Sequence, residues 1–363
     1  MRQGQDSKSS LGKFLNTKPQ AVSLSPEALV QAGPLRPGLD LPLAVQPAVD
    51  DLNLTEWAVS NPGFIEDRLL QHGGILFRNF NVGAESAYDC FVRSVTQELL
   101  DYHEPSSPRT EVGDKIYTST EYPADERIEL HNELSYSHVW PRKIFFFCLT
   151  PAEEGGETPI ADSRRVFELL DPGLKKRFIE KGVMYVRNFY EELGLPWQRV
   201  FRTADRAVAE RYFRRAGMKH EWKNGVGLRV SQVRPAAASH PKTGEVVWFN
   251  QAHLFHVSNM GPAAQESLRA LYREEELPSN AYYGDGSPIE VSVLDEIREA
   301  YRLAATTFPW RRGDILMLDN MLVAHGRASF VGARRILVAM AEPASHGTPA
   351  GRAPGARELA TGS

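Results

Sequence analysis

Cysteine is scarce in this sequence of 363 residues, and no apolar run reaches the roughly eighteen residues that a membrane-spanning helix needs. The two cysteines, Cys90 and Cys148, stand in apolar surroundings without a partner at metal-ligand spacing. We therefore expect two buried free thiols rather than a disulfide or a zinc site. The first residues, MRQGQDSKSSLGKF, lack the apolar stretch of a secretory signal. These absences favour a cytoplasmic protein that does not enter the membrane.

An excess of positive charge is also missing. The net charge is −4 and the isoelectric point is near 6.2, so neither nucleic acid nor an anionic membrane is favoured as a partner. With 42% apolar residues, the chain has enough material for a large core. Residues 1–20 and 344–363 lack apolar periodicity, so we predict two disordered tails around a single domain over residues 21–343.

Between these tails, helical and strand patterns are mixed. Apolar spacing predicts helices over residues 61–72, 84–99, 164–182 (with a break at 172–173), 262–275 and 290–305. Short apolar or alternating runs predict strands over residues 75–80, 143–150, 183–190, 244–250, 313–320, 321–330 and 333–341. Short strands with helices in between predict a mainly β fold, a sandwich or barrel with flanking helices.

A His-x-Glu pair, His131 and Glu133, lies in the stretch LHNELS. A chain with ten histidines and 46 acidic residues is expected to contain about one such pair by chance, so the pair alone proves nothing. On a strand, however, residues two apart face the same side and can meet one metal ion. His325, at the end of the apolar run MLVAH, is a candidate third ligand, although a buried strand histidine without a role is the alternative. Two histidines and one carboxylate form the facial triad of non-haem Fe(II) oxygenases.

Two further features fit a carboxylate-bearing co-substrate. Arg334 and Arg335 follow His325 on the next strand of a predicted hairpin, where a guanidinium suits bidentate carboxylate binding. The loop GGETPIADSR places the hydroxyl of Thr158 after the strand over residues 143–150. The alternatives are a plain turn at the two glycines and a surface arginine paired with an acidic side chain.

Taken in order, these motifs resemble the TauD/TfdA-type (taurine dioxygenase-like) Fe(II)/2-oxoglutarate oxygenases. The wording LHNELSYSHVWPRKIFFFC, PAEEGGETPIADSR, WFNQAHLFH and GDILMLDNMLVAHGR is most similar to the syringomycin-type aspartyl hydroxylase branch, over roughly residues 20–343. The resemblance implies a double-stranded β-helix (jelly-roll, cupin-like) core. It also implies Fe(II) bound by His131, Glu133 and His325, and 2-oxoglutarate whose far carboxylate meets Arg335 and Thr158.

The implied reaction uses O2 and 2-oxoglutarate to hydroxylate an unactivated C–H bond, with release of succinate and CO2. The implied substrate is a small amino-acid-derived molecule of a biosynthetic, natural-product pathway. The same iron chemistry ending in epoxidation, desaturation or ring closure is one alternative. A jelly-roll binding protein that has lost catalysis is another. Halogenating relatives replace the carboxylate ligand by a small residue, so the presence of Glu133 argues against halogenation.

One departure from the family pattern restricts the range of candidate substrates. The taurine enzyme has a second arginine four residues after the co-substrate arginine, whereas Ala339 stands four residues after Arg335 here. Taurine is therefore disfavoured. The missing arginine suggests a substrate whose carboxylate is masked, for instance as a thioester on a peptidyl carrier protein. The equally weighted alternative is that a different arginine binds a free substrate, with Arg142, Arg164 and Arg327 as candidates.

The segment WFNQAHLFH offers two candidate substrate-binding amides, Asn250 and Gln251, which suit recognition of amide or amine groups. The alternative is that they satisfy loop backbone. Glu121, in STEYP, is a candidate for the entrance of the pocket.

Overall fold

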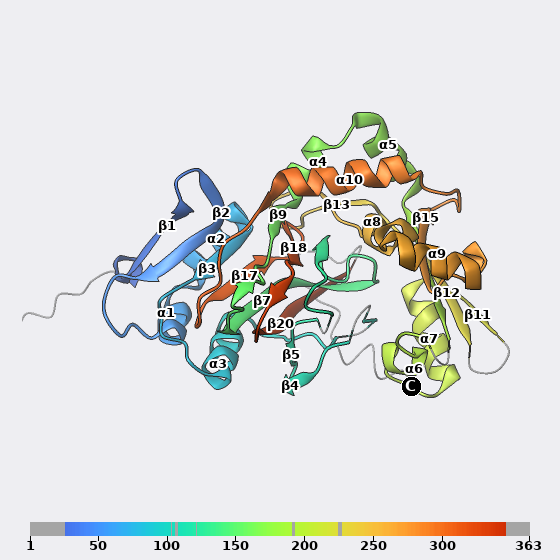
Figure 1. The fold of residues 1–363 in the computed structure, drawn as a ribbon. Helices are drawn as coiled ribbons and strands as arrows, with labels where there is room; N and C mark the ends of the chain where they lie inside the picture. Colours follow the sequence, from blue (N-terminus) through green and yellow to red (C-terminus); the bar gives the residue numbers. More distant parts are fainter. Residues whose placement is uncertain are drawn as a thin grey trace, which may run out of the picture.

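Two β-sheets packed face to face form the centre of the protein in the computed structural model (Figure 1). The structure describes residues 26–345 except 103, 106–107, 121, 191–192 and 224–226, so the predicted tails fall almost entirely outside the described residues. The main sheet has the strand order β1-β2-β3-β17-β7-β20-β5-β4 and the minor sheet the order β16-β9-β18-β6. The main-sheet strands are β1 (Val30–Arg36), β2 (Leu39–Pro47), β3 (Gly74–Phe77), β4 (Glu111–Gly113), β5 (Ile116–Thr118), β7 (Val139–Thr150), β17 (Ile315–Asp319) and β20 (Arg335–Ser345). The minor-sheet strands are β6 (Ile128–His131), β9 (Ile160–Asp162), β16 (Ala305–Thr306) and β18 (Val323–Arg327).

The apolar run of β7 shows why both faces of the main sheet are covered. Side chains alternate along a strand, so Phe146 packs between the two sheets while Phe145 and Phe147 point to the opposite face. We call the cluster between the sheets the inner cluster; it includes Ile144, Phe146, Ile336 and Val338 of the main sheet and Ile160 and Val323 of the minor sheet. The His-x-Glu pair, His131 and Glu133, lies between Leu130 and Leu134 of this cluster.

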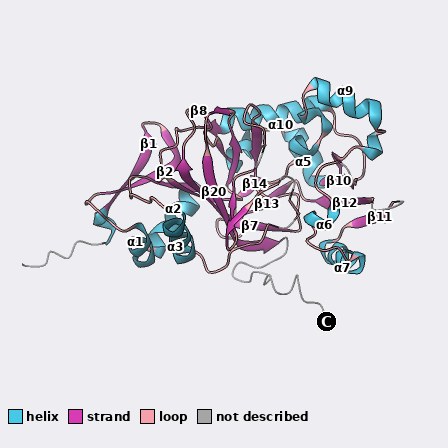
Figure 2. Ribbon diagram, turned by 60° about the horizontal axis from the view of Figure 1, so that its bottom comes forward, coloured by secondary structure: helices cyan, strands magenta, loops and turns pink. Residues whose placement is uncertain are grey.

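Three helices cover the other face of the main sheet, where Figure 2 shows them grouped below the strands. They are α1 (Leu54–Ser60), α2 (Pro62–His72) and α3 (Glu85–Val95). We call the cluster that they form with this face the outer cluster; it contains Trp57, Leu69 and Tyr88 of the helices with Phe147, Leu337 and Ala339 of the sheet. The ring of Tyr88 stacks on Phe147 with 5.0 Å between centroids.

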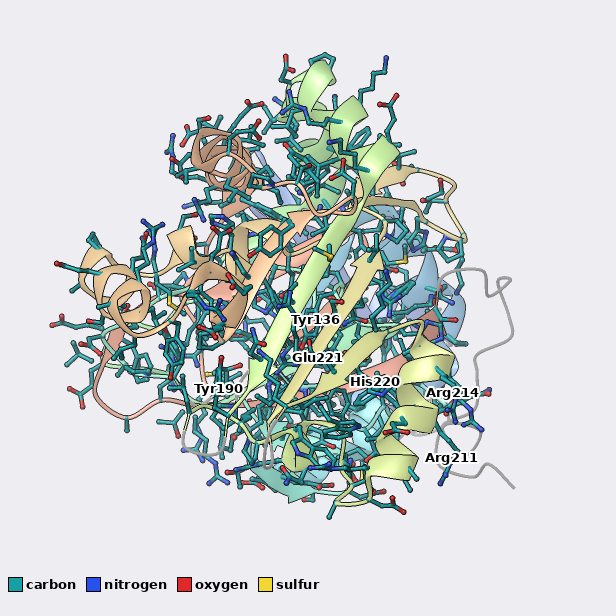
Figure 3. All side chains as sticks on the ribbon, turned by 90° about the vertical axis from the view of Figure 1, so that its right-hand side faces the viewer. Tyr136, Tyr190, Arg211, Arg214, His220 and Glu221 are labelled. Atoms are coloured by element: carbon teal, nitrogen blue, oxygen red, sulfur yellow. The ribbon has the colours of Figure 1, made fainter. Side chains whose placement is uncertain are left out.

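A third β-sheet lies beside the two central sheets and shares the inner cluster through residues of β10 and β15. It has the order β11-β12-β10-β15, from β10 (Val183–Phe189), β11 (Lys219–Trp222), β12 (Leu228–Arg234) and β15 (Ser279–Tyr283). Helices α6 (Trp197–Val200) and α7 (Arg206–Ala216) pack on it around their own apolar cluster, which includes Phe189 and Phe213. Figure 3 looks onto this lobe, with Arg211 and Arg214 of α7 pointing away from the sheet.

A buried carboxylate ties this lobe to the rest of the protein. Glu104 accepts hydrogen bonds from Ser137 (2.7 Å), from Gln232 of β12 (3.2 Å) and from Tyr212 of α7. Ser137 follows the His-x-Glu pair by a few residues, so the lobe is fixed relative to this pair by a polar contact in addition to apolar packing.

The remaining elements connect and cover these layers. The helices are α4 (Ser163–Leu169), α5 (Pro172–Lys181), α8 (Ala252–Phe255), α9 (Pro262–Leu271) and α10 (Val291–Ala304), with short 3-10 helices η2 (Pro26–Leu29), η3 (Val257–Asn259) and η4 (Glu274–Glu276). The short strand pairs are β8 (Glu154–Gly155) with β19 (Phe330–Val331), and β13 (Ala237–Ser239) with β14 (Val246–Trp248). Within the described part of the chain, no helix has the length and apolar character to cross a bilayer.

The predicted fold class is confirmed, and three local expectations are corrected. Strands β18 and β20 do not form the predicted hairpin, because β18 pairs in the minor sheet while β20 pairs with β7 and β5 in the main sheet. Cys148 is buried and free as expected, but the free Cys90 is exposed. Glu133 does not lie on a strand, because β6 ends at His131.

Candidate metal centre

The two histidines of the predicted triad are direct cross-strand partners. His131 is the last residue of β6, and His325 lies opposite it on β18, with 4.6 Å between ring centroids. Glu133 follows two residues later, and its Oε2 lies 3.6 Å from Nε2 of His325. Potential ligand atoms of all three residues lie within 4.8 Å of one another. The sheet register therefore brings together all three residues that the sequence singled out.

A buried amide outside the motif sets the position of Glu133. The side chain of Asn320, just after β17, accepts a hydrogen bond from the backbone N–H of Glu133 (2.7 Å). The same amide donates to the carbonyls of Glu133 (2.9 Å) and Pro141 (2.8 Å). Asn320 thus replaces the strand partner that Glu133 lacks and holds the turn that aims its carboxylate.

We expect Asn320→Ala to weaken Fe(II) binding by about 10–100-fold, which is the usual cost of removing a group that orients a metal ligand. The reason is that Glu133 loses hydrogen bonds at both its N–H and its carbonyl. Anaerobic Fe(II) titration of the folded variant measures the effect. An unchanged affinity would show that the turn holds its shape without Asn320.

The charge states at the centre suit a divalent cation. Burial acts to raise the pKa of Glu133, but the nearby guanidinium of Arg109 and the contact with His325 hold that pKa well below its usual range. Burial, with the second imidazole close by, lowers the pKa of His131 to about 4. At neutral pH the centre therefore presents an ionised carboxylate and a neutral imidazole, the forms that bind metal.

Hydrogen bonding also selects the ring nitrogen that His131 presents. Its Nδ1 lies 2.8 Å from the carbonyl of Glu129 and donates to it in the neutral ring. Nε2 is then the unprotonated nitrogen that faces the other two residues. One charged oxygen donor and two imidazoles fit Fe(II), and further coordination positions stay available to small ligands.

An arginine that the sequence reasoning missed completes the centre. Nη2 of Arg109 donates to Oε2 of Glu133 at 2.6 Å, and both side chains are only 4% exposed. The guanidinium lies over the ring of Tyr102, 4.4 Å from its centroid. Arg109 is in an irregular stretch before β4, 24 residues from Glu133, where no periodicity points to a site.

The two candidate co-substrate arginines extend to opposite sides of the main sheet. Arg335 is half-exposed, pairs with Glu85 of α3 at 2.7 Å and extends to the helix-covered side of the main sheet. Arg334 extends to the opposite side, where Nε donates to the carbonyl of Gly156 (2.8 Å) and Nη1 to the hydroxyl of Ser119 (3.3 Å). The structure thus does not place Arg335 at the site, because neighbouring residues of a strand face opposite ways.

Arg334 has the character of an anion-binding group. Burial and the neighbouring Arg327 lower its pKa to about 10, and in the described part of the chain it makes no salt bridge. Arg334 and Arg327 both lie over the ring of Phe330, at 5.6 and 5.1 Å from its centroid. Two cations this close are stabilised by an anion placed beside them.

Thr158 lies two residues after Gly156, the residue whose carbonyl holds Arg334, and it is 2% exposed. Its hydroxyl accepts a hydrogen bond from the indole of Trp310 (3.1 Å), so the hydroxyl proton remains available for an acceptor. Gly156 permits the close approach of Arg334, because a Cβ there would lie 3.0 Å from Cδ of the arginine. The close approach of Arg334 therefore explains why the second glycine of the GGET motif is a glycine.

The predicted substrate-binding amides are buried and donate to backbone carbonyls. Asn250 is fully buried and donates to the carbonyl of Ala236 (2.7 Å), and Gln251 donates to the carbonyl of Asn132 (2.7 Å). Both therefore brace backbone, and Gln251 braces the residue between His131 and Glu133. Glu121 lies outside the described residues.

One buried histidine near the centre gives the protein a pH-dependent stability. His253 donates from Nε2 to the carbonyl of Leu130 (2.9 Å), and burial lowers its pKa to about 3 from an ordinary 6.5. Between these values the unfolded chain binds a proton that the folded chain does not. Stability is therefore lost as the pH falls from about 6.5, by up to about 1.4 kcal/mol per pH unit from this group.

We expect His253→Gln, which keeps an N–H donor, to reduce the stability difference of the apo-protein between pH 7 and pH 5 by about 2 kcal/mol. Urea unfolding of both proteins at the two pH values measures this. An identical pH dependence in the variant would contradict the assignment.

Comparison with known proteins is consistent with this geometry. The family model of the taurine catabolism dioxygenase TauD, TfdA family matches residues 34–341. The chain is 38% identical over 299 residues to the dapdiamide synthesis protein DdaC of Enterobacter agglomerans, covering 82% of this chain and 90% of DdaC. It is 29% identical over 343 residues to a clavaminate synthase-like protein of Arabidopsis thaliana, covering 90% of this chain and 95% of that protein.

Solved structures share the fold at low sequence identity. The PvcB protein from Pseudomonas aeruginosa aligns with a TM-score of 0.52 and 16% identity, covering 88% of this chain and 92% of PvcB. A second structure, described as PvcB, an Fe, alpha-ketoglutarate dependent oxygenase from an isonitrile synthetic pathway, aligns with a TM-score of 0.50 and 16% identity, covering 89% and 94%. These likenesses concern the fold.

Proposed function

Because this chain belongs to the taurine catabolism dioxygenase TauD, TfdA family, we propose that it hydroxylates an unactivated C–H bond of a small amino-acid-derived substrate in a biosynthetic pathway. The observation that carries the proposal is the convergence of His131, Glu133 and His325 within 4.8 Å beside a buried arginine. Family membership makes the protein a dioxygenase, with iron as its metal and 2-oxoglutarate and O2 as co-substrates.

In this proposal His131, Glu133 and His325 hold Fe(II), and Asn320 and Glu129 orient two of these ligands through backbone and ring contacts. When bound, iron with 2-oxoglutarate and O2 supplies the oxidant that removes hydrogen from carbon, and succinate and CO2 are released. The chain itself positions the substrate and limits the access of water.

Arg334 and Thr158 hold the far carboxylate of 2-oxoglutarate. The guanidinium is fixed by Gly156 and Ser119, and the hydroxyl is fixed by Trp310, so both groups are oriented before the co-substrate binds. This assignment replaces Arg335 by Arg334 and keeps Thr158.

The substrate class is supported by the similarity to DdaC, a protein of dapdiamide synthesis. Taurine stays disfavoured after the one-residue correction. Four residues after Arg334 stands Val338, a member of the inner cluster, and Ala339 belongs to the outer cluster. Neither position offers a cation for a sulfonate. A free substrate and one tethered to a peptidyl carrier protein both fit the proposal.

The test is an anaerobic absorbance titration of the apo-protein with Fe(II) and 2-oxoglutarate, followed by O2 and measurement of succinate. A visible metal-to-ligand charge-transfer band and succinate release are expected. Candidate amino acids and aminoacyl carrier proteins that shift the band are then tested for a mass gain of one oxygen. A folded protein that takes up iron but gives no band would contradict the proposal.

A further inference from the structure

A cavity of about 320 Å³ opens beside the candidate metal centre. One wall comes from β6 and Glu133, and the opposite wall comes from β10, the 193–195 loop and the start of β15. His131, Glu133 and Arg109 all line it, so a molecule in this space lies next to the metal ligands. The cavity is of the size that small-molecule sites have.

The cavity contains more positive than negative groups among its described lining residues. Three arginines line it (Arg109, Arg127 and Arg187), against two glutamates (Glu129 and Glu133). Arg127 pairs with Glu129 at the exposed rim (2.7 Å). Arg187 is held by the carbonyl of Pro105 (2.8 Å) and lies over Phe189, and no carboxylate in the described chain pairs with it.

Arg109, one of the residues that line the cavity, has hydrogen-bonding capacity that the described structure leaves unused. Only Nη2 is engaged, with Glu133, while Nε and Nη1 are buried without a partner in the described structure. Buried guanidinium nitrogens without acceptors are costly, so such groups mark the place of a missing acceptor. The need of Arg109 for a further acceptor grows when a metal binds, because Glu133 then shares its negative charge with the metal cation.

The other candidate arginines are engaged elsewhere. Arg327 donates to the carbonyls of Tyr122, Pro123 and Glu126. Arg164 pairs with Asp162 (2.7 Å) and Glu245 (3.2 Å), and Arg142 lies 3.9 Å from Glu342. None of the three lines the cavity described above.

We propose that Arg109 binds a carboxylate of the substrate through the edge of its guanidinium that Glu133 leaves free. The inference rests on the proposed function and adds to it that the substrate presents an anionic group next to the metal. Arg187 supplies a second positive charge on the opposite wall. The absence of a second arginine on β20 then no longer argues for a masked carboxylate, because an arginine from a different part of the chain takes its place.

The geometry also explains how such a substrate is oriented. A guanidinium is planar and presents its N–H groups in a fixed fork, which binds a carboxylate in one direction. Arg109 is itself fixed by Glu133 and by the ring of Tyr102. A carboxylate bound to it is therefore held at a set distance from the metal ligand, and the carbon atoms attached to that carboxylate are placed for reaction.

The test uses the Fe(II)/2-oxoglutarate complex under argon and two matched probes, N-acetyl-L-alanine and its neutral amide, N-acetyl-L-alaninamide. Binding is followed by the shift of the charge-transfer band and by calorimetry. We expect the wild-type protein to bind the acid about tenfold or more tightly than the amide. Arg109→Gln is expected to remove this preference, and Arg109→Lys, which keeps the charge but not the fork, to retain part of it.

The matched control is Arg127→Gln, which removes an arginine from the exposed rim of the same cavity and is expected to keep the preference. The band without probe is recorded for every protein. Its absence in the wild type contradicts the proposed function. A normal band without acid preference in the wild type, or with the preference intact in Arg109→Gln, overturns this inference alone. Arg109→Gln can also lose iron affinity. If Arg109→Lys then keeps the full wild-type preference for the acid, Arg109 serves only to hold Glu133, and this outcome also overturns the inference.

Discussion

Replacing His325 by alanine is expected to lower 2-oxoglutarate turnover by roughly a thousandfold or more, because a bound metal supplies several kcal/mol of the catalytic effect. His325 lies opposite His131 on the paired strand, and besides Glu133 no described histidine, cysteine or acidic side chain joins their cluster. The measurement is succinate release per enzyme, together with iron content after anaerobic loading.

The control for this variant is His220→Ala. His220 is an exposed histidine of β11, at the edge of the third sheet, and it lies on the face seen in Figure 3. We expect wild-type iron content and turnover from it. Normal turnover in His325→Ala, or a loss of equal size in His220→Ala, would contradict the assignment of the metal centre.

Arg334→Gln is expected to weaken 2-oxoglutarate binding by about 100-fold, the cost of removing one partner of a buried charge pair. The glutamine keeps a polar side chain but neither the charge nor the fork that Gly156 and Ser119 hold in place. Titration of the charge-transfer band against 2-oxoglutarate measures the change, and iron binding is expected to remain.

The next residue provides a matched control. Arg335→Gln removes the same charge one position along the chain, but it breaks only a half-exposed pair with Glu85. Such pairs contribute little, so we expect 2-oxoglutarate affinity within about threefold of the wild-type value. A larger loss of 2-oxoglutarate affinity in Arg335→Gln than in Arg334→Gln would contradict this assignment. It would show that Arg335, and not Arg334, faces the co-substrate.

The candidate metal ligands could be brought together from sequence because His131 and Glu133 are two residues apart, His325 ends the apolar run MLVAH, and the order of the motifs resembles the TauD/TfdA-type oxygenases. The choice between Arg334 and Arg335 was not predictable in the same way. Both belong to one charged pair at the start of β20, where the pairing register with β7 shifts, and only the three-dimensional register decides which of them faces inward.

Two further residues escaped sequence reasoning for different physical reasons. Arg109 lies in irregular backbone, where no periodicity marks a direction, and its role depends on a contact with Glu133. Asn320, 187 residues further along the chain, accepts the hydrogen bond from the backbone of Glu133 that a strand partner would otherwise accept. Asn250 and Gln251 show the reverse case, because amides that suit a substrate by composition are used to brace loops.

The lobe carried by β10–β12 has an apolar cluster of its own and supplies the wall of the cavity that faces the metal ligands. One part of this lobe is thus stabilised by a core of its own, while Val183 and Tyr185 of β10 pack in the inner cluster with the strands of the metal centre. Changes in separate cores have nearly additive effects on stability. We therefore expect substitutions in the α6–α7 part of the lobe, which packs in its own cluster, to leave the stability of the metal centre nearly unchanged.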